Sequence, residues 1–374
     1  MEKSFVFGKP VDSDNFIGRE VEVARLSANF RGGINTILMS PRRWGKTSLV
    51  NRVANEIASP NLKIIRMDIF SCRSEYDFYN TFAAEILKQT ASRLEEWKEL
   101  AVGFIERLTP KISITPDAAT EYSVSLGITP KTHSPEEILN LPEVIAQRKG
   151  YQMVVCIDEF QQIGEFPASL SVQKKMRSVW QHQQNASYCL YGSKLHLMTN
   201  FFQKKSYPFY KFGDFLYLEN IPTDKWIPYV QQQFQTVGKN ISPELVGKLC
   251  ATVDNHSSYV QQLAWYTLLN TQTTATEDNL SAAVEELVQQ NEPLFVQQTE
   301  TLTSYQLNFL RAVLRGVKSG FGATNIREEY QLGTTSNIVR LKQALLEKEL
   351  IEIHLDGVSI ADPVLNMWLR KVLN

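Results

Sequence analysis

Two hydrophobic patterns alternate over residues 1–221. Short runs of β-branched and apolar residues, typical of strands buried in a parallel sheet, cover residues 34–39, 63–68, 151–159 and 187–193. After the first run, apolar residues recur at helical spacing from Leu49 to Ile57, and a second helical stripe follows over residues 76–108. Strands that alternate with helices predict an α/β domain built on a parallel sheet.

Residues 111–131 interrupt this rhythm. Apolar and polar residues alternate on both sides of a short stretch at residues 117–120. Alternation around a turn predicts a β-hairpin inserted in the α/β domain. The hairpin could contact a partner, or it could be an exposed decoration without a role.

The pattern changes again at Pro222. Helical spacing predominates over residues 222–300 and predicts a helical lid. Over residues 301–374, two helical stripes precede two short apolar runs around a turn at residues 355–357. Helices followed by a small hairpin are the order of a winged-helix domain, so we predict three domains with boundaries near residues 221 and 300.

Composition narrows the class of protein. The 374 residues are 43% hydrophobic and carry a formal net charge of −1, which excludes a wholly basic nucleic-acid coat protein but not a small basic patch. The four cysteines form no C-x-x-C pair, so we expect buried, reduced thiols and a cytoplasmic protein. No apolar run approaches the ~18 residues that cross a bilayer, so we expect no membrane partner.

The first candidate for chemistry follows the strand at residues 34–39. Residues 40–48 read Ser-Pro-Arg-Arg-Trp-Gly-Lys-Thr-Ser. They match the P-loop (Walker A) pattern G-x-x-x-x-G-K-[ST], except that Ser40 replaces the first glycine. The order of strand, tight loop and helix is the context that a P-loop needs, and an ordinary strand–helix turn is the alternative.

The residue types of this loop suit a nucleotide. Gly45 lets the backbone approach an anion closely, and the amides at the helix N-terminus face the phosphates. Lys46 can reach the β- and γ-phosphates and assist catalysis, and the Thr47 hydroxyl can coordinate Mg²⁺. The residues expected to contact the phosphates of ATP or ADP are Arg43, Trp44, Gly45, Lys46, Thr47 and Ser48.

An acidic pair, of the Walker B kind, ends the run at residues 151–159. The run is apolar up to Ile157 and closes with Asp158 and Glu159. The C-terminal ends of buried parallel strands face ligands, so Asp158 is predicted to hold Mg²⁺ and Glu159 to polarise the water that attacks the γ-phosphate. A buried strand followed by a solvated acidic turn is the alternative.

A small polar residue ends the next strand. Ser193 closes the run at residues 187–193 and is the candidate to contact the attacking water or the γ-phosphate. A Gly-Ser turn is the alternative. Arg177, on a helix after the acidic pair, is a further candidate phosphate sensor, although a solvated helix face explains it as well.

Four segments together resemble one family. Residues 16–20 (Phe-Ile-Gly-Arg-Glu) resemble a box of AAA-type ATPases, and residues 40–48 resemble the P-R-R-x-G-K-T-S loop of archaeal and bacterial ATPases related to origin-recognition and STAND NTPases. Residues 255–263 resemble the G-H-P-x-Y-x-Q-x-L stretch of that family, and residues 362–369 resemble its D-P-[LV]-F-x-x-W-L ending. The resemblance covers nearly the whole chain.

The resemblance implies an ATP-binding AAA-like core, a small helical lid and a winged-helix tail. It also implies that Phe16, Ile17 and Gly18 lie near the adenine and ribose. Two departures stand out. His256-Ser257 replaces His-Pro, and Lys211 lies in a stretch where relatives often carry an arginine. Because lysine makes no bidentate phosphate contact, slow hydrolysis or a nucleotide-dependent switch is expected rather than a motor.

The function predicted is therefore that of a slow, Mg²⁺-dependent ATPase that acts as a nucleotide-driven switch. A winged-helix DNA-binding regulator with structural ATP, and a protein-interaction scaffold, are the alternatives. Residues 303–374 hold nine basic and seven acidic side chains, a modest excess that leaves both duplex DNA and a protein open as partners of the tail. On the predicted helix at residues 336–347, Asn337, Arg340 and Gln343 would face outward. Oligomerisation stays open.

Overall fold

A computed structural model describes residues 5–11, 15–91, 134–354 and 356–373. The chain divides into two compact units, Arg19–Glu219 and a second that joins Met1–Gly18 to Asn220–Asn374. The hairpin predicted at residues 111–131 lies outside the described residues.

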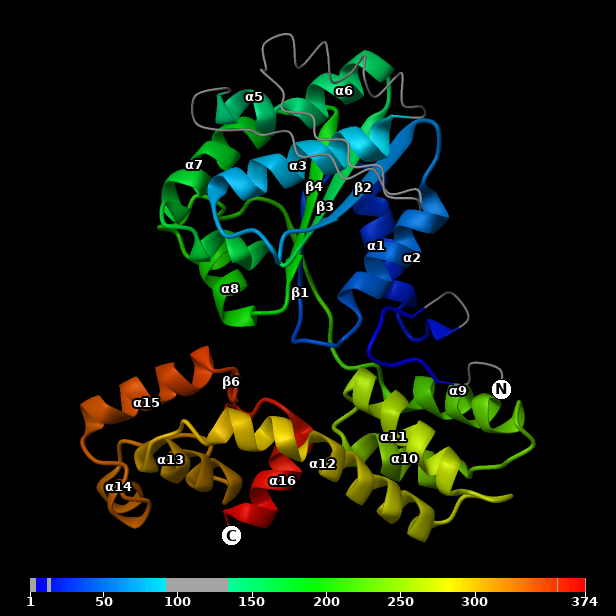
Figure 1. The fold of residues 1–374 in the computed structure, drawn as a ribbon, viewed down its shortest axis with the longest axis vertical. Coiled ribbons are helices and arrows are strands. Elements are labelled where there is room, and N and C mark those ends of the chain that lie inside the picture. The colour runs from blue at the N-terminus through cyan, green and yellow to red at the C-terminus, as the bar shows by residue number, and fades with distance from the viewer. Residues whose placement is uncertain (1–4, 12–14, 92–133, 355, 374) are drawn as a thin grey trace, which may run out of the picture. The chain divides into compact units, whose positions relative to one another are not determined.

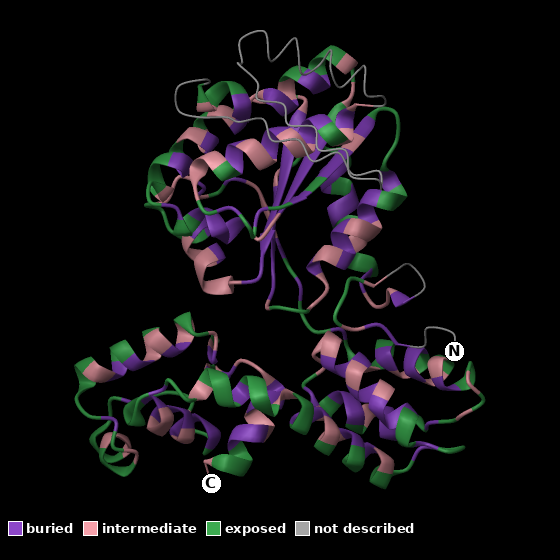
Figure 2. Ribbon diagram, viewed as in Figure 1, coloured by how far each residue is buried: buried purple, intermediate pink, exposed green. Residues whose placement is uncertain are grey.

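The first unit contains a five-stranded parallel sheet with the order β2-β3-β4-β1-β5 (Figure 1). Its strands are β1 (Thr36–Met39), β2 (Leu62–Asp68), β3 (Gln152–Asp158), β4 (Ala186–Gly192) and β5 (Asp214–Tyr217). The predicted α/β class and parallel sheet are confirmed. Figure 2 shows β1, β3 and β4 buried between the helices, as continuous apolar runs require.

Helices cover both faces of this sheet. The helix α1 (Glu20–Arg31) packs with α2 (Lys46–Ile57) on one face, and α3 (Glu75–Thr90) lies on the other (Figure 1). The remaining helices of this unit are α5 (Pro135–Leu139), α6 (Leu141–Lys149), η2 (Phe160–Glu165), α7 (Ser169–Trp180) and α8 (Leu195–Gln203). The connection through α2 runs from β1 to β2 at the edge of the sheet, and the connection through α3 runs back from β2 to β3. Because both crossovers are right-handed, α2 and α3 lie on opposite faces of the sheet.

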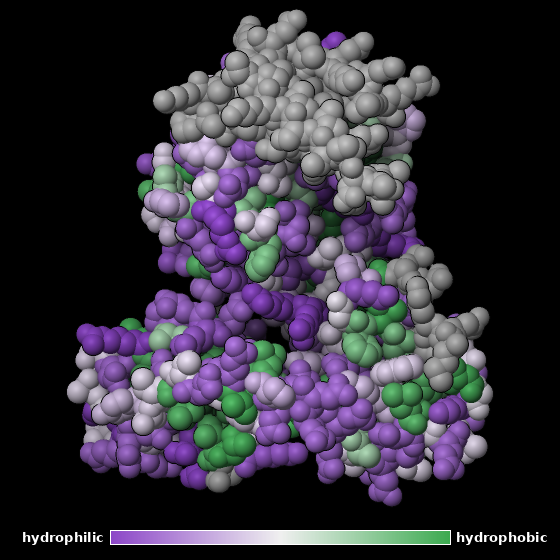
Figure 3. All heavy atoms as spheres, viewed as in Figure 1, coloured by the Kyte–Doolittle hydropathy of each residue, from purple (hydrophilic) through white to green (hydrophobic). Residues whose placement is uncertain are grey.

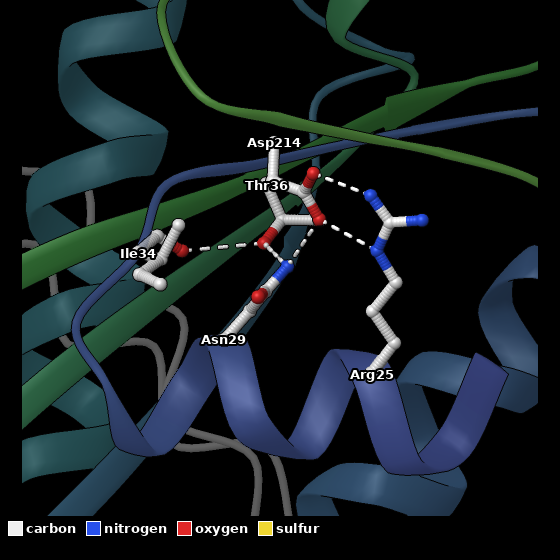
Figure 4. Close-up of polar contacts among 5 residues, drawn as sticks. All are labelled: Arg25, Asn29, Ile34, Thr36 and Asp214. Atoms are coloured by element: carbon white, nitrogen blue, oxygen red, sulfur yellow. Dashed lines mark hydrogen bonds and ion pairs between the residues drawn. The ribbon is translucent and has the colours of Figure 1, made fainter. Parts of the chain in front are cut away.

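A polar cluster attaches the edge strand β5 to α1 (Figure 4). Arg25 donates from Nε and Nη2 to the two carboxylate oxygens of Asp214, at 2.9 and 2.5 Å. The Asn29 amide donates to Asp214 Oδ2 at 2.8 Å and to Thr36 Oγ1 at 3.1 Å. The hydrogen bond from Arg25 holds the pKa of Asp214 below its usual value. The cluster therefore joins one helix to two strands, and the sequence did not predict β5.

The second unit is helical apart from one hairpin. Its helices are α9 (Thr223–Gln235), α10 (Pro243–Thr252), α11 (Ser257–Asn270), α12 (Glu277–Thr299), α13 (Ser304–Leu314), α14 (Thr324–Glu329), α15 (Thr335–Glu347) and α16 (Pro363–Val372). The hairpin pairs β6 (Ile351–His354) with β7 (Gly357–Ile360) in antiparallel register. One apolar cluster runs through the whole unit. The predicted order of helices and hairpin in the tail is confirmed.

Two of the resemblance motifs meet inside this unit. Tyr259, on α11, donates its hydroxyl to Asp362 Oδ2 at 2.5 Å. Asp362 Oδ1 accepts from the backbone amides of Val364 and Leu365, and so caps α16. Tyr259 and Asp362, which are 103 positions apart in the sequence, are thus joined by one hydrogen bond.

The long helix α12 also contacts α16. Trp368 Nε1 donates to Glu292 Oε1 at 3.0 Å, and the Trp368 ring lies 5.9 Å from that of Phe295. Both partners of Trp368 belong to α12, which begins in the predicted lid. Residues of the predicted lid and of the winged helix therefore pack in one core.

The N-terminal segment packs on the same unit. Val6 donates its amide to Gln261 Oε1 at 3.1 Å, and Tyr229 places its hydroxyl 2.8 Å from Asn15 Oδ1 and 2.9 Å from Gln261 Oε1. Gly18 has φ +63°, and a Cβ there would lie 2.6 Å from Ile221 Cγ2. The conformation and the close contact both explain glycine at this position.

Within the described ranges, every helix is too short or too polar to span a lipid bilayer. Hydrophilic residues predominate on the face drawn in Figure 3, and the hydrophobic residues there form small areas.

Candidate functional site

The loop between β1 and α2 has the geometry of an anion-binding turn. Gly45 is the N-cap of α2 and has φ +94°, a conformation that other residues rarely adopt. A Cβ at Gly45 would meet nothing within 4 Å, so the positive φ rather than crowding explains glycine at this position. Arg43 also has a positive φ, of 62°. The loop thus turns its backbone sharply just where the helix dipole favours negative charge.

Lys46 reaches back across this loop. Its Nζ donates to the carbonyl oxygens of Ser40 and Pro41, both at 2.8 Å, and to Ser40 Oγ at 3.3 Å. The departure from the glycine of the standard pattern therefore adds a hydroxyl acceptor for the ammonium group. Ser40 does not have a positive φ, so the backbone at this position does not require glycine.

Thr47 and Asp158 meet where α2 begins and β3 ends. Thr47 Oγ1 donates to Asp158 Oδ2 at 2.8 Å, and Asp158 Oδ1 accepts from the Glu159 amide at 2.8 Å. Burial raises the pKa of Asp158 to about 6, opposed by the hydrogen bond from Thr47 and aided by the charge of Glu159. Residues 111 positions apart thus come together at the carboxyl edge of the sheet.

These two side chains fit a magnesium ion. A hydroxyl and a carboxylate are hard oxygen ligands, and Mg²⁺ in nucleotide sites takes one or two protein carboxylates and fills its shell with phosphate and water. Asp68, at the end of β2, lies directly opposite Asp158 in the parallel register and adds negative charge at the same edge.

Glu159 contacts the strand end that the sequence predicted as a sensor. Ser193, with 8% of its surface exposed, donates from Oγ to Glu159 Oε2 at 3.0 Å. Gln161 Nε2 donates to the same carboxylate oxygen. Glu159 has φ 54°, so the chain turns sharply into η2 directly after the acidic pair. The predicted catalytic residues Glu159 and Ser193 are therefore in direct contact.

Two contributors were missed by the sequence analysis. Arg19, with 4% exposure, donates from Nη1 to Glu22 Oε1 at 2.8 Å and from Nη2 to the Trp44 carbonyl at 3.2 Å, so it supports the loop from behind. Its place in the Phe-Ile-Gly-Arg-Glu box was the available signal. Gln161 carried no signal of its own, because a polar residue after a strand usually indicates solvent.

Other predicted residues have different surroundings. The Arg177 guanidinium lies 4.9 Å from the Phe212 ring centroid, and burial lowers its pKa. Lys211 has φ 55°, and its Nζ lies 5.6 Å from the ring centroid of its neighbour Tyr210. Both cations are thus packed against aromatic rings. Ser48 is buried in the first turn of α2.

The predicted base-pocket residues belong to the second unit. Ile17 packs against the apolar cluster of that unit, and a Cβ at Gly18 would lie 2.6 Å from Ile221 and 3.2 Å from Lys225. The roles of Phe16, Ile17 and Gly18 at the adenine stay predictions.

Known proteins share this fold. A Walker-type ATPase of Pyrococcus abyssi superposes with a TM-score of 0.69 at 18% identity, covering 98% of this chain and 99% of that chain. The ORC2 protein of Aeropyrum pernix, solved as ADPNP–ADP complexes, superposes with a TM-score of 0.56 at 16% identity, covering 100% of this chain and 96% of that chain. Its ADP form gives 0.56 at 15% identity, covering 99% of this chain and 97% of that chain.

Residues 293–371 match a family model described as a probable winged helix domain, and no curated protein matches the chain. At these identities the superpositions establish the fold. The AAA-type fold and the C-terminal winged helix, both predicted from the motifs, are confirmed.

Proposed function

We propose that the chain binds ATP and ADP with Mg²⁺ at residues 40–48 and hydrolyses ATP slowly, as a nucleotide-driven switch. The observation that carries this proposal is the 2.8 Å hydrogen bond between Thr47 and Asp158, beside a P-loop whose Gly45 caps α2 in a left-handed conformation. A hydroxyl and a carboxylate that converge at a helix N-terminus form the Mg²⁺ side of a nucleotide site.

Each residue of the site has one role in binding. The amides from Arg43 to Ser48 surround the phosphates, and Lys46 exchanges its carbonyl partners for phosphate oxygens. Thr47 and Asp158 hold Mg²⁺, which neutralises charge on the β- and γ-phosphates when bound.

Hydrolysis is assigned to Glu159. Its carboxylate accepts a proton from a water molecule while the water oxygen attacks the γ-phosphorus and ADP leaves. Ser193 holds this carboxylate through the 3.0 Å hydrogen bond to Oε2. The Arg177 and Lys211 cations lie over aromatic rings. This packing supports slow turnover, because neither cation is directed at the phosphates as a bidentate arginine would be.

The test is ATP turnover with and without Mg²⁺, in the native chain and in Glu159→Gln. The variant should bind ATP with native affinity and lose turnover by about 100-fold or more, since a neutral amide fills the same space but accepts no proton. Glu165→Gln is the matched control, because Glu165 lies in the same η2 segment and pairs with Lys194 at 2.9 Å. Native turnover in Glu159→Gln, or none in the native chain, overturns the proposal of an ATPase.

The second candidate is duplex DNA binding through α15. This helix buries Ile338, Leu341 and Leu345 and exposes Val339, Arg340 and Gln343, as a helix that enters a major groove does. Asn337 differs from the sequence prediction. It is half-buried, and its amide donates to the Leu332 carbonyl at 2.9 Å.

Arg340→Ala distinguishes the two possibilities for the tail. A DNA-reading helix gives duplex affinity that falls steeply with salt and falls further in this variant. No duplex binding at low salt would instead favour a protein as the partner of the tail.

A further inference from the structure

The carboxylate of Glu159 is held by one oxygen only. Both Gln161 Nε2 and Ser193 Oγ donate to Oε2, the latter at 3.0 Å. Within the part of the chain that the structure describes, Oε1 accepts no hydrogen bond from the protein. Two donors on one oxygen fix the plane of the carboxylate and leave the other oxygen to accept from water.

Gln161 is itself fixed. Only 2% of its surface is exposed, and it lies two residues after Glu159, past the left-handed turn. A Cβ at Gly192 would lie 1.7 Å from Gln161 Oε1, so the amide occupies space that any other residue at position 192 would fill. Gly192, the last residue of β4, thus leaves room for the Gln161 donor, and Ser193, the next residue, supplies the other.

Charge determines which way this amide points. A carboxylate accepts hydrogen bonds and repels a carbonyl oxygen, so the amide must turn its NH₂ group to Glu159. Its Oε1 then faces Gly192 and has no hydrogen-bond partner among the described residues. A buried acceptor without a partner destabilises the folded protein, so a contact elsewhere on this side chain must offset that cost. The donor on Glu159 is the compensating contact.

We infer that Gln161 is a positioning residue for the general base. It orients Glu159 so that Oε1 faces the attacking water, while Ser193 supports the same oxygen from the neighbouring strand. The inference rests on the proposed hydrolysis and names a residue outside the P-loop, the acidic pair and the sensor serine. A misplaced base slows the chemical step without changing the contacts that bind the nucleotide.

The test compares two adjacent buried glutamines. Gln161→Met keeps the side-chain length and removes the donor, so kcat should fall about 10- to 100-fold while the affinity for ATP stays native. Gln162→Met is the control. Gln162 is 5% exposed and donates to the Cys72 carbonyl and to Glu165, both at 3.2 Å, so its loss should change stability but not kcat.

A second variant and a double substitution exclude a purely structural effect. Gly192→Ala should displace the flexible end of Gln161 and lower kcat in the same way in a folded protein. In a Glu159→Gln background, Gln161→Met should cause no further loss, because both changes act through one carboxylate. Native kcat in Gln161→Met, or equal losses in the Gln162 control, overturns the inference alone. Native kcat in Glu159→Gln overturns the proposed function with it.

Discussion

Replacing Asp158 with asparagine should stabilise the nucleotide-free protein at high pH while removing Mg²⁺-dependent turnover. Burial raises the pKa of Asp158 from its usual 3.8 to about 6. The folded protein therefore binds this proton more tightly than the unfolded chain. The stabilisation of the folded protein by protonated Asp158 is fully present below about pH 4 and is lost as the pH rises through about 6.

The magnitude follows from the two pKa values. At about 1.4 kcal/mol per pKa unit, an ionised Asp158 destabilises the folded protein at pH 8 by about 3 kcal/mol. Asparagine carries no charge, but it keeps only one of the acceptor oxygens that bind Thr47 Oγ1 and the Glu159 amide, which costs about 1 kcal/mol. The net gain at pH 8 is therefore about 1–2 kcal/mol.

Urea unfolding of the native chain and of Asp158→Asn at pH 8, 6 and 4 measures this difference. The advantage of the variant should shrink below pH 6 and be gone by about pH 4. Asp68→Asn is the control, since Asp68 lies opposite Asp158 in the sheet but is exposed. A variant no more stable than the native chain at pH 8, or an advantage that does not change with pH, would refute the reasoning.

Lys46→Ala should weaken ATP and ADP binding about 10-fold or more, because the ammonium group within reach of the phosphates is lost; calorimetric titration measures this, and native affinity in a folded variant would contradict the P-loop assignment. Asp214→Asn should cost about 0.5–1 kcal/mol at pH 7, measured by urea unfolding. Since Arg25 holds the pKa of Asp214 below its usual value, that cost should vanish as the pH falls through the native pKa. Tyr259→Phe should destabilise the second unit by about 1–2 kcal/mol, since Asp362 loses a hydrogen bond. A melting temperature unchanged by Tyr259→Phe would show that the contact is dispensable.

Local sequence signals predicted most of the first unit. Of the strands that the pattern predicted, β1, β3 and β4 are buried along most of their length, so their sequences are largely apolar runs. The edge strand β5 was missed because it has four residues, begins with Asp214 and leaves Tyr217 46% exposed. Its position depends on Arg25, 189 residues earlier in the chain, and no local pattern encodes such a contact.

The candidate site shows the same division. Gly45, Lys46 and Thr47 are adjacent in sequence, and Asp158 and Glu159 follow a strand, so their types and spacing predicted Thr47 and Asp158 as ligands of one Mg²⁺; their hydrogen bond is a finding of the structure. Hydrogen bonds that join side chains from different segments could not be predicted. Gln161 acquires its meaning only because Gly192, on another strand, leaves it room.

The helix α12 bears on how this architecture could be recombined. Its 23 residues extend about 35 Å, and the winged-helix match begins at Pro293, inside it. No linker separates the helical lid from the winged-helix domain, so the winged helix cannot be transferred to another protein as an independent domain. A fragment that starts at Thr303 would leave Trp368 without Glu292 and Phe295, and a chimaera with a foreign tail would have to import the end of α12 as well. Because Tyr259 on α11 also bonds Asp362, gene fusions that keep this protein folded should keep residues 220–374 together rather than place a junction at the apparent domain boundary.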